Sequence, residues 1–164
     1  MLDLAAKKKL GIIMLIFLVL LLVGCSQSDE VFKQRSEVAE KNKDTIKIGV
    51  GWSFSANKTK LYQGVKLAAE EINESGGVLG KKIVLGRGDD EADVNKGLKV
   101  AEAFASDPNV MAVIGHKESY VTEAVSLIYE TAKLLELSPK STNPKLSQKG
   151  YKYFFRNVPT DAQI

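Results

Sequence analysis

The sequence predicts an α/β fold, a Rossmann-like parallel sheet with helices on both faces. From residue 45 onward, short apolar runs alternate with segments in which apolar residues recur every three or four positions. This alternation is typical of strand–helix–strand units with right-handed crossovers. The run 110–114 (VMAVI) is continuously apolar, as expected of a strand covered on both faces. Cys25 is the only cysteine, which excludes an intramolecular disulfide, so the domain must be held together by its core.

The first strand–helix–strand unit is predicted between residues 45 and 85. Residues 45–50 (TIKIGV) alternate and then become apolar, as a buried strand does. A helix is predicted at 58–75, where apolar residues share one face: Leu61, Val65, Ala68 and Ile72. Gly76 and Gly77 mark its end, because glycine adopts the left-handed conformation readily. Residues 82–85 (KIVL) are the second strand.

The remaining elements follow in the same alternation. Asp93 is a candidate N-cap for a second helix, which Asp107-Pro108 ends. After the strand at 110–114, Ser119 is a candidate cap for a third helix, whose apolar face consists of Val121, Ala124, Val125 and Ile128. A fourth strand is predicted at 134–137, interrupted by Glu136, and a fifth at 151–155.

The first 24 residues predict an export signal. Lys7, Lys8 and Lys9 precede a 14-residue apolar run at 10–23, the composition of a secretory signal. A membrane-spanning helix needs about 20 apolar residues, so this run is marginal as one. The run ends in Leu22-Val23-Gly24-Cys25, which resembles the lipobox of bacterial lipoproteins. That resemblance implies cleavage after residue 24 and a lipid on Cys25.

We therefore expect a signal peptide at 1–24, a lipidated tether at 25–44 and a folded lobe at 45–164. The tether is rich in charge and poor in large apolar residues, so we expect it to be solvated, with little for a short helix to pack on. The alternative is an uncleaved anchor helix with an incidental cysteine. Both interpretations place the rest of the chain outside the cytoplasm and attached to a membrane.

Several strings of the folded part resemble the first lobe of the type I periplasmic binding proteins of the leucine/isoleucine/valine receptor family. They are IKIGV (46–50), AEEIN (69–73) with GGVLG (76–80), AVIGH (112–116), SP (138–139) with TNPKL (142–146), and GYKYFFR (150–156). The strings occur in the family's order and spacing and cover about residues 45–164. The resemblance implies a receptor that serves an ABC permease and binds an amino acid or a related amide.

The family resemblance also implies a ligand site at the carboxyl ends of the strands. In the family, a hydroxyl and backbone N–H groups hold the α-carboxylate of the ligand, an arrangement that suits an anion at a helix N-terminus. On this chain, Ser119 and Thr142 take the positions of the hydroxyl residues, and Lys140 takes that of a small residue that offers its backbone. Trp52 and Asn57 lie where the family shapes the side-chain pocket, and Asp161 lies at the first crossover between lobes.

Each of these residues also has a purely structural explanation. Ser119 could be only an N-cap, Thr142 could satisfy a turn before Pro144, and Trp52 could pack under the tether. His116 has no second histidine or cysteine nearby, which favours a hydrogen-bonded loop residue over a metal ligand. The acidic run 89–91 is explained by a solvated loop that leads to the Asp93 cap.

The chain also departs from the family pattern. Lys140 is a long cation where the family has a small residue, so it could either add a charge-assisted contact or fill the pocket. Lys133 stands in place of a glycine turn, and Glu136 interrupts an apolar strand. The receptors have two lobes, and the sequence reaches only the first crossover, so we expect an incomplete first lobe with an uncovered sheet edge and face.

The sequence thus predicts an extracytoplasmic solute-binding lipoprotein with no enzymatic chemistry and no metal or cofactor. Removing residues 1–24 leaves 20 basic and 19 acidic side chains, a balance that gives no reason to expect a nucleic-acid partner. The chain has no P-loop, no dinucleotide fingerprint and no metal-ligand cluster. Two alternatives remain: an extracytoplasmic sensing domain of a signalling system, and a degenerate fragment that binds nothing.

Overall fold

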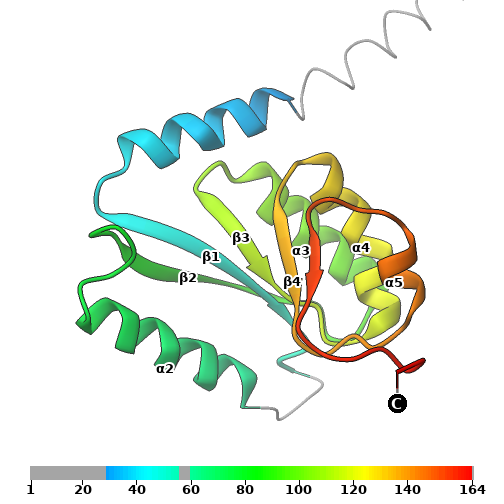
Figure 1. Ribbon diagram of the computed structural model, residues 1–164. Helices are drawn as coiled ribbons and strands as arrows, with labels where there is room; N and C mark the ends of the chain where they lie inside the picture. The colour runs from blue at the N-terminus through cyan, green and yellow to red at the C-terminus, as the bar shows by residue number, and fades with distance from the viewer. Residues whose placement is uncertain (1–28, 56–59, 164) are drawn as a thin grey trace, which may run out of the picture.

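The computed structural model describes residues 29–55 and 60–163 (Figure 1). The predicted signal peptide, Cys25 and Asn57 therefore lie outside the described residues. Five strands, all parallel to their neighbours, form one sheet in the order β2-β1-β3-β4-β5. Their bounds are β1 Thr45–Trp52, β2 Lys82–Asp89, β3 Val110–Ile114, β4 Leu135–Ser138 and β5 Phe154–Arg156. The predicted α/β class with a parallel sheet is confirmed.

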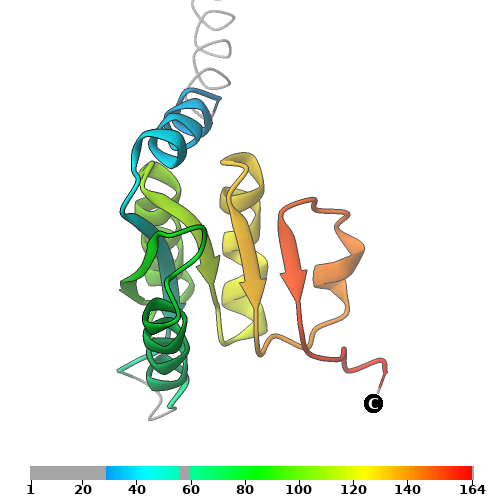
Figure 2. The ribbon, with the colours of Figure 1, turned by 60° about the vertical axis from the view of Figure 1, so that its left-hand side comes forward.

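Four labelled helices connect the strands: α2 Leu61–Glu74, α3 Val94–Ser106, α4 Ser119–Thr131 and the short α5 Lys145–Gln148. Helices α3 and α4 lie side by side on one face of the sheet, and α2 lies on the other (Figures 1 and 2). The main core fills the space between the sheet and the α3–α4 layer. Its buried members are Ala101, Phe104, Ala105, Val110, Val113, Val121, Val125, Tyr129, Ala132 and Leu134.

The predicted element boundaries agree with the structure to within a few residues. The strand 110–114 is found with the predicted bounds, and Asp93 caps α3 by accepting a hydrogen bond from the backbone N–H of Lys96 at 2.9 Å. Helix α2 ends at Glu74, followed by Gly76 and Gly77 with φ of 101° and 77°. The prediction of Ser119 as a cap is wrong: the N-cap of α4 is Glu118, and Ser119 is the first helical residue. Helix α5 was not predicted.

Residues 29–41 form a helix that packs on the amino-terminal edge of the sheet (Figure 1). The side chain of Arg35 is 5% exposed. Its guanidinium donates hydrogen bonds to the carbonyl oxygens of Ala105, Val110 and Ala132 at 2.9, 2.8 and 3.0 Å. Burial lowers the pKa of Arg35, and the charge of Asp107 opposes this shift. The expectation that this segment has little to pack on is therefore wrong.

A second set of contacts holds the same helix from the turn after α4. Lys133 adopts a left-handed backbone conformation with φ of 51°, where the resemblance led us to expect a glycine. Its ammonium group lies 3.0 Å from the Asp29 carboxylate and 4.8 Å from the centre of the Phe32 ring. The left-handed conformation costs roughly 1–2 kcal/mol for a residue with a Cβ. In return, the Lys133 side chain makes two contacts that a glycine could not make.

The face of the sheet on the α2 side is only partly covered. Ile48, Ile83, Leu85 and Ile114 line a hollow of about 260 Å³ beneath α2. Farther along this face, Leu135 on β4 and Phe155 on β5 are 40% and 50% exposed. The expectation of an uncovered apolar face agrees with these exposures. No helix within residues 29–55 and 60–163 is long and apolar enough to cross a membrane.

We expect Arg35→Met to lower the free energy of unfolding by about 3 kcal/mol, because it leaves three buried carbonyl groups without a donor. Urea denaturation followed by circular dichroism measures this change. Lys33→Met, at an exposed position of the same helix, is the matched control and should change stability little. Equal effects of the two substitutions would contradict the role assigned to the guanidinium.

Candidate functional site

The candidate site lies at the carboxyl edge of the sheet, where all five strands end. Because the strands are parallel, their last residues lie at one edge of the sheet: Trp52, Asp89, Ile114, Ser138 and Arg156. Ligands of open α/β sheets bind in the crevice outside this edge. The structure thus places the loops that the sequence singled out along one side of the lobe (Figure 2).

At this edge β1 and β3 approach so closely that only glycine fits between them. A Cβ atom on Gly115 would lie 2.3 Å from the carbonyl oxygen of Gly51. A Cβ atom on Gly51 would lie 2.7 Å from the imidazole ring of His116. Real Cβ atoms do not approach other atoms so closely, so both positions need glycine. The two glycines let the His116 ring pack directly against β1, where it is fully buried.

His116 is hydrogen-bonded at both ring nitrogens. Its Nδ1 lies 2.6 Å from Oδ2 of Asp90, and its Nε2 lies 3.1 Å from the hydroxyl of Tyr129. Burial, together with the nearby carboxylates of Glu136 and Asp90, raises the pKa of Tyr129 well above its ordinary value. The interpretation of His116 as a hydrogen-bonded residue is confirmed. No group of three or more potential metal ligands occurs within the described part of the chain.

The acidic run 89–91 is not the solvated loop that the sequence suggested. Asp90 is 1% exposed and holds His116. The Asp89 carboxylate accepts hydrogen bonds from the backbone N–H groups of Phe54, Ser55 and Glu91 and from the Ser55 hydroxyl. Burial raises the pKa of Asp89, but these hydrogen bonds outweigh it and the net pKa is lowered. Asp89 therefore fixes the loop after β1 to the end of β2.

The main-chain oxygen of His116 accepts hydrogen bonds from three hydroxyl groups, which belong to α4, to the end of β4 and to the loop 139–144. It lies 3.2 Å from Oγ1 of Thr122, 3.4 Å from Oγ of Ser138 and 3.1 Å from Oγ of Ser141. The Thr122 and Ser141 hydroxyls are also 2.7 Å apart. This buried cluster joins the end of β3, the first turn of α4 and the start of the loop 139–144, so the loop is fixed relative to the helix N-terminus.

Three of the predicted ligand residues come together around this loop. The Oγ of Ser119 accepts a hydrogen bond from the backbone N–H of Asn143 at 3.4 Å, next to Thr142. The carbonyl oxygen of Thr142 accepts one from the backbone N–H of Asp161 at 3.0 Å. Ser119, at the start of a 13-residue helix, therefore lies close to the loop at Asn143, and Asp161 contacts the same loop through the opposite side of the Thr142–Asn143 peptide unit. A hydroxyl and exposed amide groups at a helix N-terminus are suited to an anion such as a carboxylate.

The other predicted residues are placed differently. Lys140 is exposed, so its side chain does not fill a pocket within this lobe. Trp52 is 3% exposed and lies at the carboxyl end of β1, whereas the helix 29–41 packs at the amino-terminal edge of the sheet. The alternative that Trp52 packs under the tether is therefore wrong. Asn57 lies outside the described residues.

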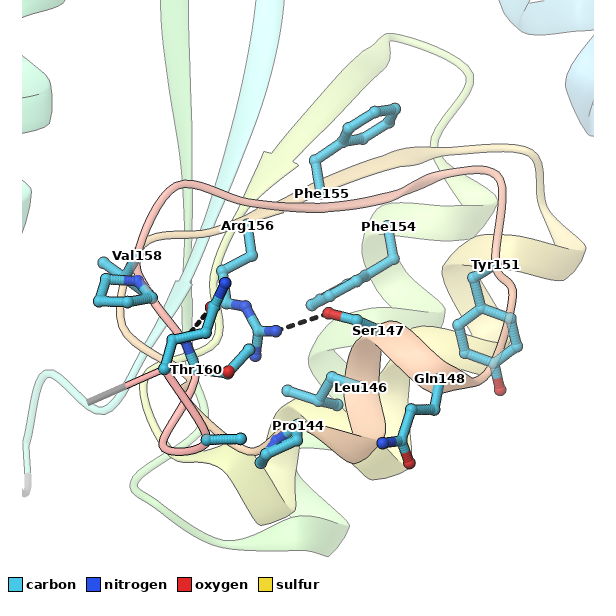
Figure 3. Close-up of a pocket in the computed structure, with 13 residues that line it drawn as sticks. Pro144, Leu146, Ser147, Gln148, Tyr151, Phe154, Phe155, Arg156, Val158 and Thr160 are labelled. Carbon is cyan, nitrogen blue, oxygen red and sulfur yellow. Dashed lines mark hydrogen bonds between the residues drawn. The ribbon is translucent and has the colours of Figure 1, made fainter.

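A separate hollow of about 870 Å³ opens at the β5 edge of the sheet, between α5, β5 and the last described residues (Figure 3). Leu146, Tyr151 and Phe154 line it, together with the polar side chains of Ser147, Gln148 and Arg156. None of the predicted ligand residues that the structure describes lines this hollow. We therefore place the candidate ligand site at Ser119 and Thr142.

Glu136 on β4 is a buried carboxyl group that has no hydrogen-bond partner among residues 29–55 and 60–163. It is 1% exposed, and both of its oxygens lack a donor at hydrogen-bonding geometry. Burial raises the pKa of Glu136 to about 8, although the nearby Ser126 hydroxyl opposes this shift. The Ser126 hydroxyl instead donates to the carbonyl oxygen of Thr122 at 2.6 Å. The sequence marked Glu136 as a charged residue in a strand that should be apolar. The structure agrees, because the carboxyl group lies in a buried position that favours its neutral form.

Sequence reasoning did not single out Ser138, Ser141 or Arg156 as site residues. Arg156 donates to the carbonyl oxygens of Ser141 and Asn143 at 3.1 and 2.9 Å. All three residues lie at strand ends or in the loop 139–144; Ser138 and Arg156 stand inside strings that carried the family resemblance, and Ser141 stands between two of them. Their position at the carboxyl ends of the strands could have marked them as site residues. The sequence does not show, however, which groups these side chains bond.

The comparisons with known proteins agree with this geometry. The sequence profile of a family described as "Periplasmic binding protein" matches residues 45–164. The chain belongs to this family, and its relatives place it among the type I binding proteins of the Leu/Ile/Val group. Membership implies a location outside the cytoplasm, and the relatives are named as binding proteins rather than enzymes.

Individual relatives are similar over the same region. The Leu/Ile/Val-binding protein homolog 1 of Brucella abortus is 39% identical over 104 residues, which is 63% of this chain and 28% of the relative. The Leucine-specific-binding protein of Salmonella typhimurium is 38% identical over 123 residues, 73% of this chain and 33% of the relative. The chain therefore spans about a third or less of the length of these curated relatives.

A solved structure shows the same fold. An ABC transporter substrate-binding protein from Desulfitobacterium hafniense, solved in complex with Leu, superposes with a TM-score of 0.72 and 45% sequence identity. The match covers 73% of this chain and 36% of that chain. The first lobe predicted from the sequence therefore has a counterpart of known structure.

We expect Glu136→Leu to stabilise the protein above pH 8 and to have little effect near pH 5. The fold favours the protonated carboxyl group, so stability is lost as pH rises from the ordinary glutamate pKa toward the folded pKa of about 8. At about 1.4 kcal/mol per pKa unit, the penalty at pH 7 is on the order of 3 kcal/mol. Urea denaturation at several pH values, with the exposed-site variant Glu102→Leu as control, measures it; a pH-independent difference would contradict the assignment.

Proposed function

We propose that this chain forms the first lobe of an extracytoplasmic solute-binding protein of an ABC importer, and that its ligand is a branched-chain or related amino acid or amide. The observation that carries the proposal is the convergence of Ser119, Thr142 and the N-terminus of α4 at the carboxyl edge of the sheet. The names of the relatives, which include Leu/Ile/Val-binding and Leucine-specific-binding proteins, support the ligand class.

In the proposed complex, the ligand carboxylate lies against the N-terminus of α4. The Ser119 hydroxyl and the amide groups of the loop 139–144 donate to it, and the helix dipole adds a favourable interaction with the negative charge. Because Lys140 is exposed rather than packed into the lobe, its ammonium group is free to approach the same carboxylate. Of the two alternatives for Lys140, this supports the charge-assisted contact.

We also propose that Cys25 carries a lipid that attaches the protein to the membrane, where it serves an ABC permease. The proposal rests on the sequence Leu22-Val23-Gly24-Cys25 after a basic and then apolar segment. Two acyl chains give stable attachment, since each buried CH₂ contributes about 0.8 kcal/mol.

The ligand proposal predicts a specific response of the loop amides to L-leucine. In a titration followed by ¹H–¹⁵N NMR, the amide signals of Ser119 and of residues 140–143 should shift. Ser119→Ala and Thr142→Val should each weaken binding about tenfold or more, as expected for loss of a hydrogen bond to a charged group. Thr131→Val, at an exposed position at the end of α4, should bind as the parent does. Unchanged spectra with L-leucine and with other amino acids would refute the proposal.

The anchor proposal predicts that metabolic labelling with a palmitate analogue modifies the parent chain and not Cys25→Ala. A Cys25→Ala chain should also remain unprocessed, because cleavage of a lipoprotein signal requires the lipidated cysteine. Equal labelling of both chains, or processing of Cys25→Ala at residue 24, would contradict the lipoprotein signal. A parent chain that stays unlabelled and unprocessed would favour the uncleaved anchor helix.

A further inference from the structure

The guanidinium of Arg156 binds the loop 139–144, the ligand loop of the proposed function. Arg156 is the last residue of β5, and its Nη1 donates to the carbonyl oxygens of Ser141 and Asn143 at 3.1 and 2.9 Å. Its Nη2 donates to Oγ of Ser147 at 2.5 Å, the bond drawn in Figure 3. One side chain thus fixes two carbonyl groups of the loop and connects them to α5.

The carbonyl group between these two is also hydrogen-bonded. The oxygen of Thr142 accepts a hydrogen bond from the backbone N–H of Asp161, five residues after Arg156. Three successive carbonyl groups, those of Ser141, Thr142 and Asn143, therefore accept donors from the end of β5 and the segment that follows it.

This arrangement determines the direction of the loop's amide N–H groups. In a planar trans peptide unit the C=O and N–H bonds point in opposite directions. Because the Ser141 and Thr142 carbonyls point toward Arg156 and Asp161, the N–H groups of Thr142 and Asn143 point away from them. The bond from the Asn143 N–H to Oγ of Ser119 agrees with this direction. Within the described residues, no group accepts a hydrogen bond from the Thr142 N–H.

We propose that Arg156 is a positioning residue for ligand binding: its guanidinium holds the loop so that the Thr142 and Asn143 N–H groups point toward the carboxylate position beside Ser119. The inference deepens the proposed function and rests on it. The positive charge behind the loop also polarises the bonded peptide groups, which strengthens their N–H groups as donors to an anion. Arg156 itself does not touch the ligand.

The test compares Arg156→Ala and Arg156→Lys with the parent full chain in mild detergent, by NMR titration with L-leucine and with L-leucinamide. Lys152→Ala is the matched control, because it removes an exposed positive charge two residues before β5. We expect both Arg156 variants to weaken L-leucine binding at least tenfold and to reduce the preference for L-leucine over L-leucinamide, which lacks the carboxylate. Lys152→Ala should bind as the parent does.

Chemical rescue separates positioning from general damage to the fold. Arg156 lines the open hollow at the β5 edge, so millimolar ethylguanidinium can reach the space vacated in Arg156→Ala. We expect it to restore L-leucine binding to that variant and to leave the parent unchanged. Arg156→Ala that binds as the parent does, or binding that is lost without rescue in a variant whose thermal unfolding is unchanged, would overturn the inference.

A readout without ligand distinguishes failure of this inference from failure of the proposed function. In the free chain, ¹⁵N order parameters of residues 140–143 should fall from the rigid range of about 0.85 to below about 0.6 in Arg156→Ala. If the parent binds no amino acid but the loop loosens, the proposed function fails and the positioning of the loop stands. If the order parameters do not change, Arg156 does not position the loop, whatever the parent binds.

Discussion

The close approach of β1 and β3 at Gly51 and Gly115 is the constraint on which the rest of the site depends. Because neither strand has a side chain there, the His116 ring packs beneath β1, between the Asp90 carboxylate and the Tyr129 hydroxyl. The main-chain carbonyl oxygen of His116 then accepts hydrogen bonds from the hydroxyl groups of Thr122 and Ser141, which fix the start of the ligand loop. A side chain at Gly51 would collide with the His116 ring, and one at Gly115 would collide with the backbone of β1.

Local patterns predicted most of the fold, because strands and helix ends depend mainly on neighbouring residues. The apolar run of β3 and the Asp93 cap are of this kind. The helix at 29–41 was not predicted to pack, since its burial depends on one guanidinium that bonds carbonyl groups 70 to 97 positions away. Asp90 was taken for a solvated residue for the same reason: its partner, His116, lies 26 positions further along the chain.

The residues of the candidate site also fall into those that the sequence could identify and those that only the structure reveals. The family resemblance selected Ser119, Thr142 and Asp161, and in the structure Ser119 and Asp161 each contact the loop that contains Thr142. The resemblance could not select Arg156, because the role of that side chain depends on the carbonyl groups to which it donates hydrogen bonds. Glu136 shows the converse. The sequence marked it as inconsistent with its strand, and the structure buries its carboxyl group with no partner in the described part of the chain, at a cost to stability that increases with pH.

The docked helix at 29–41 limits how the lobe is oriented. Arg35 and Lys133 hold it to the edge of the sheet opposite the candidate site, so the lobe cannot tumble freely about this segment as it would on a random coil. With the proposed lipid on Cys25, only residues 26–28 separate the bilayer from the described helix. The helix-bearing edge would then be the part of the lobe nearest to the point of attachment, and the candidate ligand edge the part farthest from it.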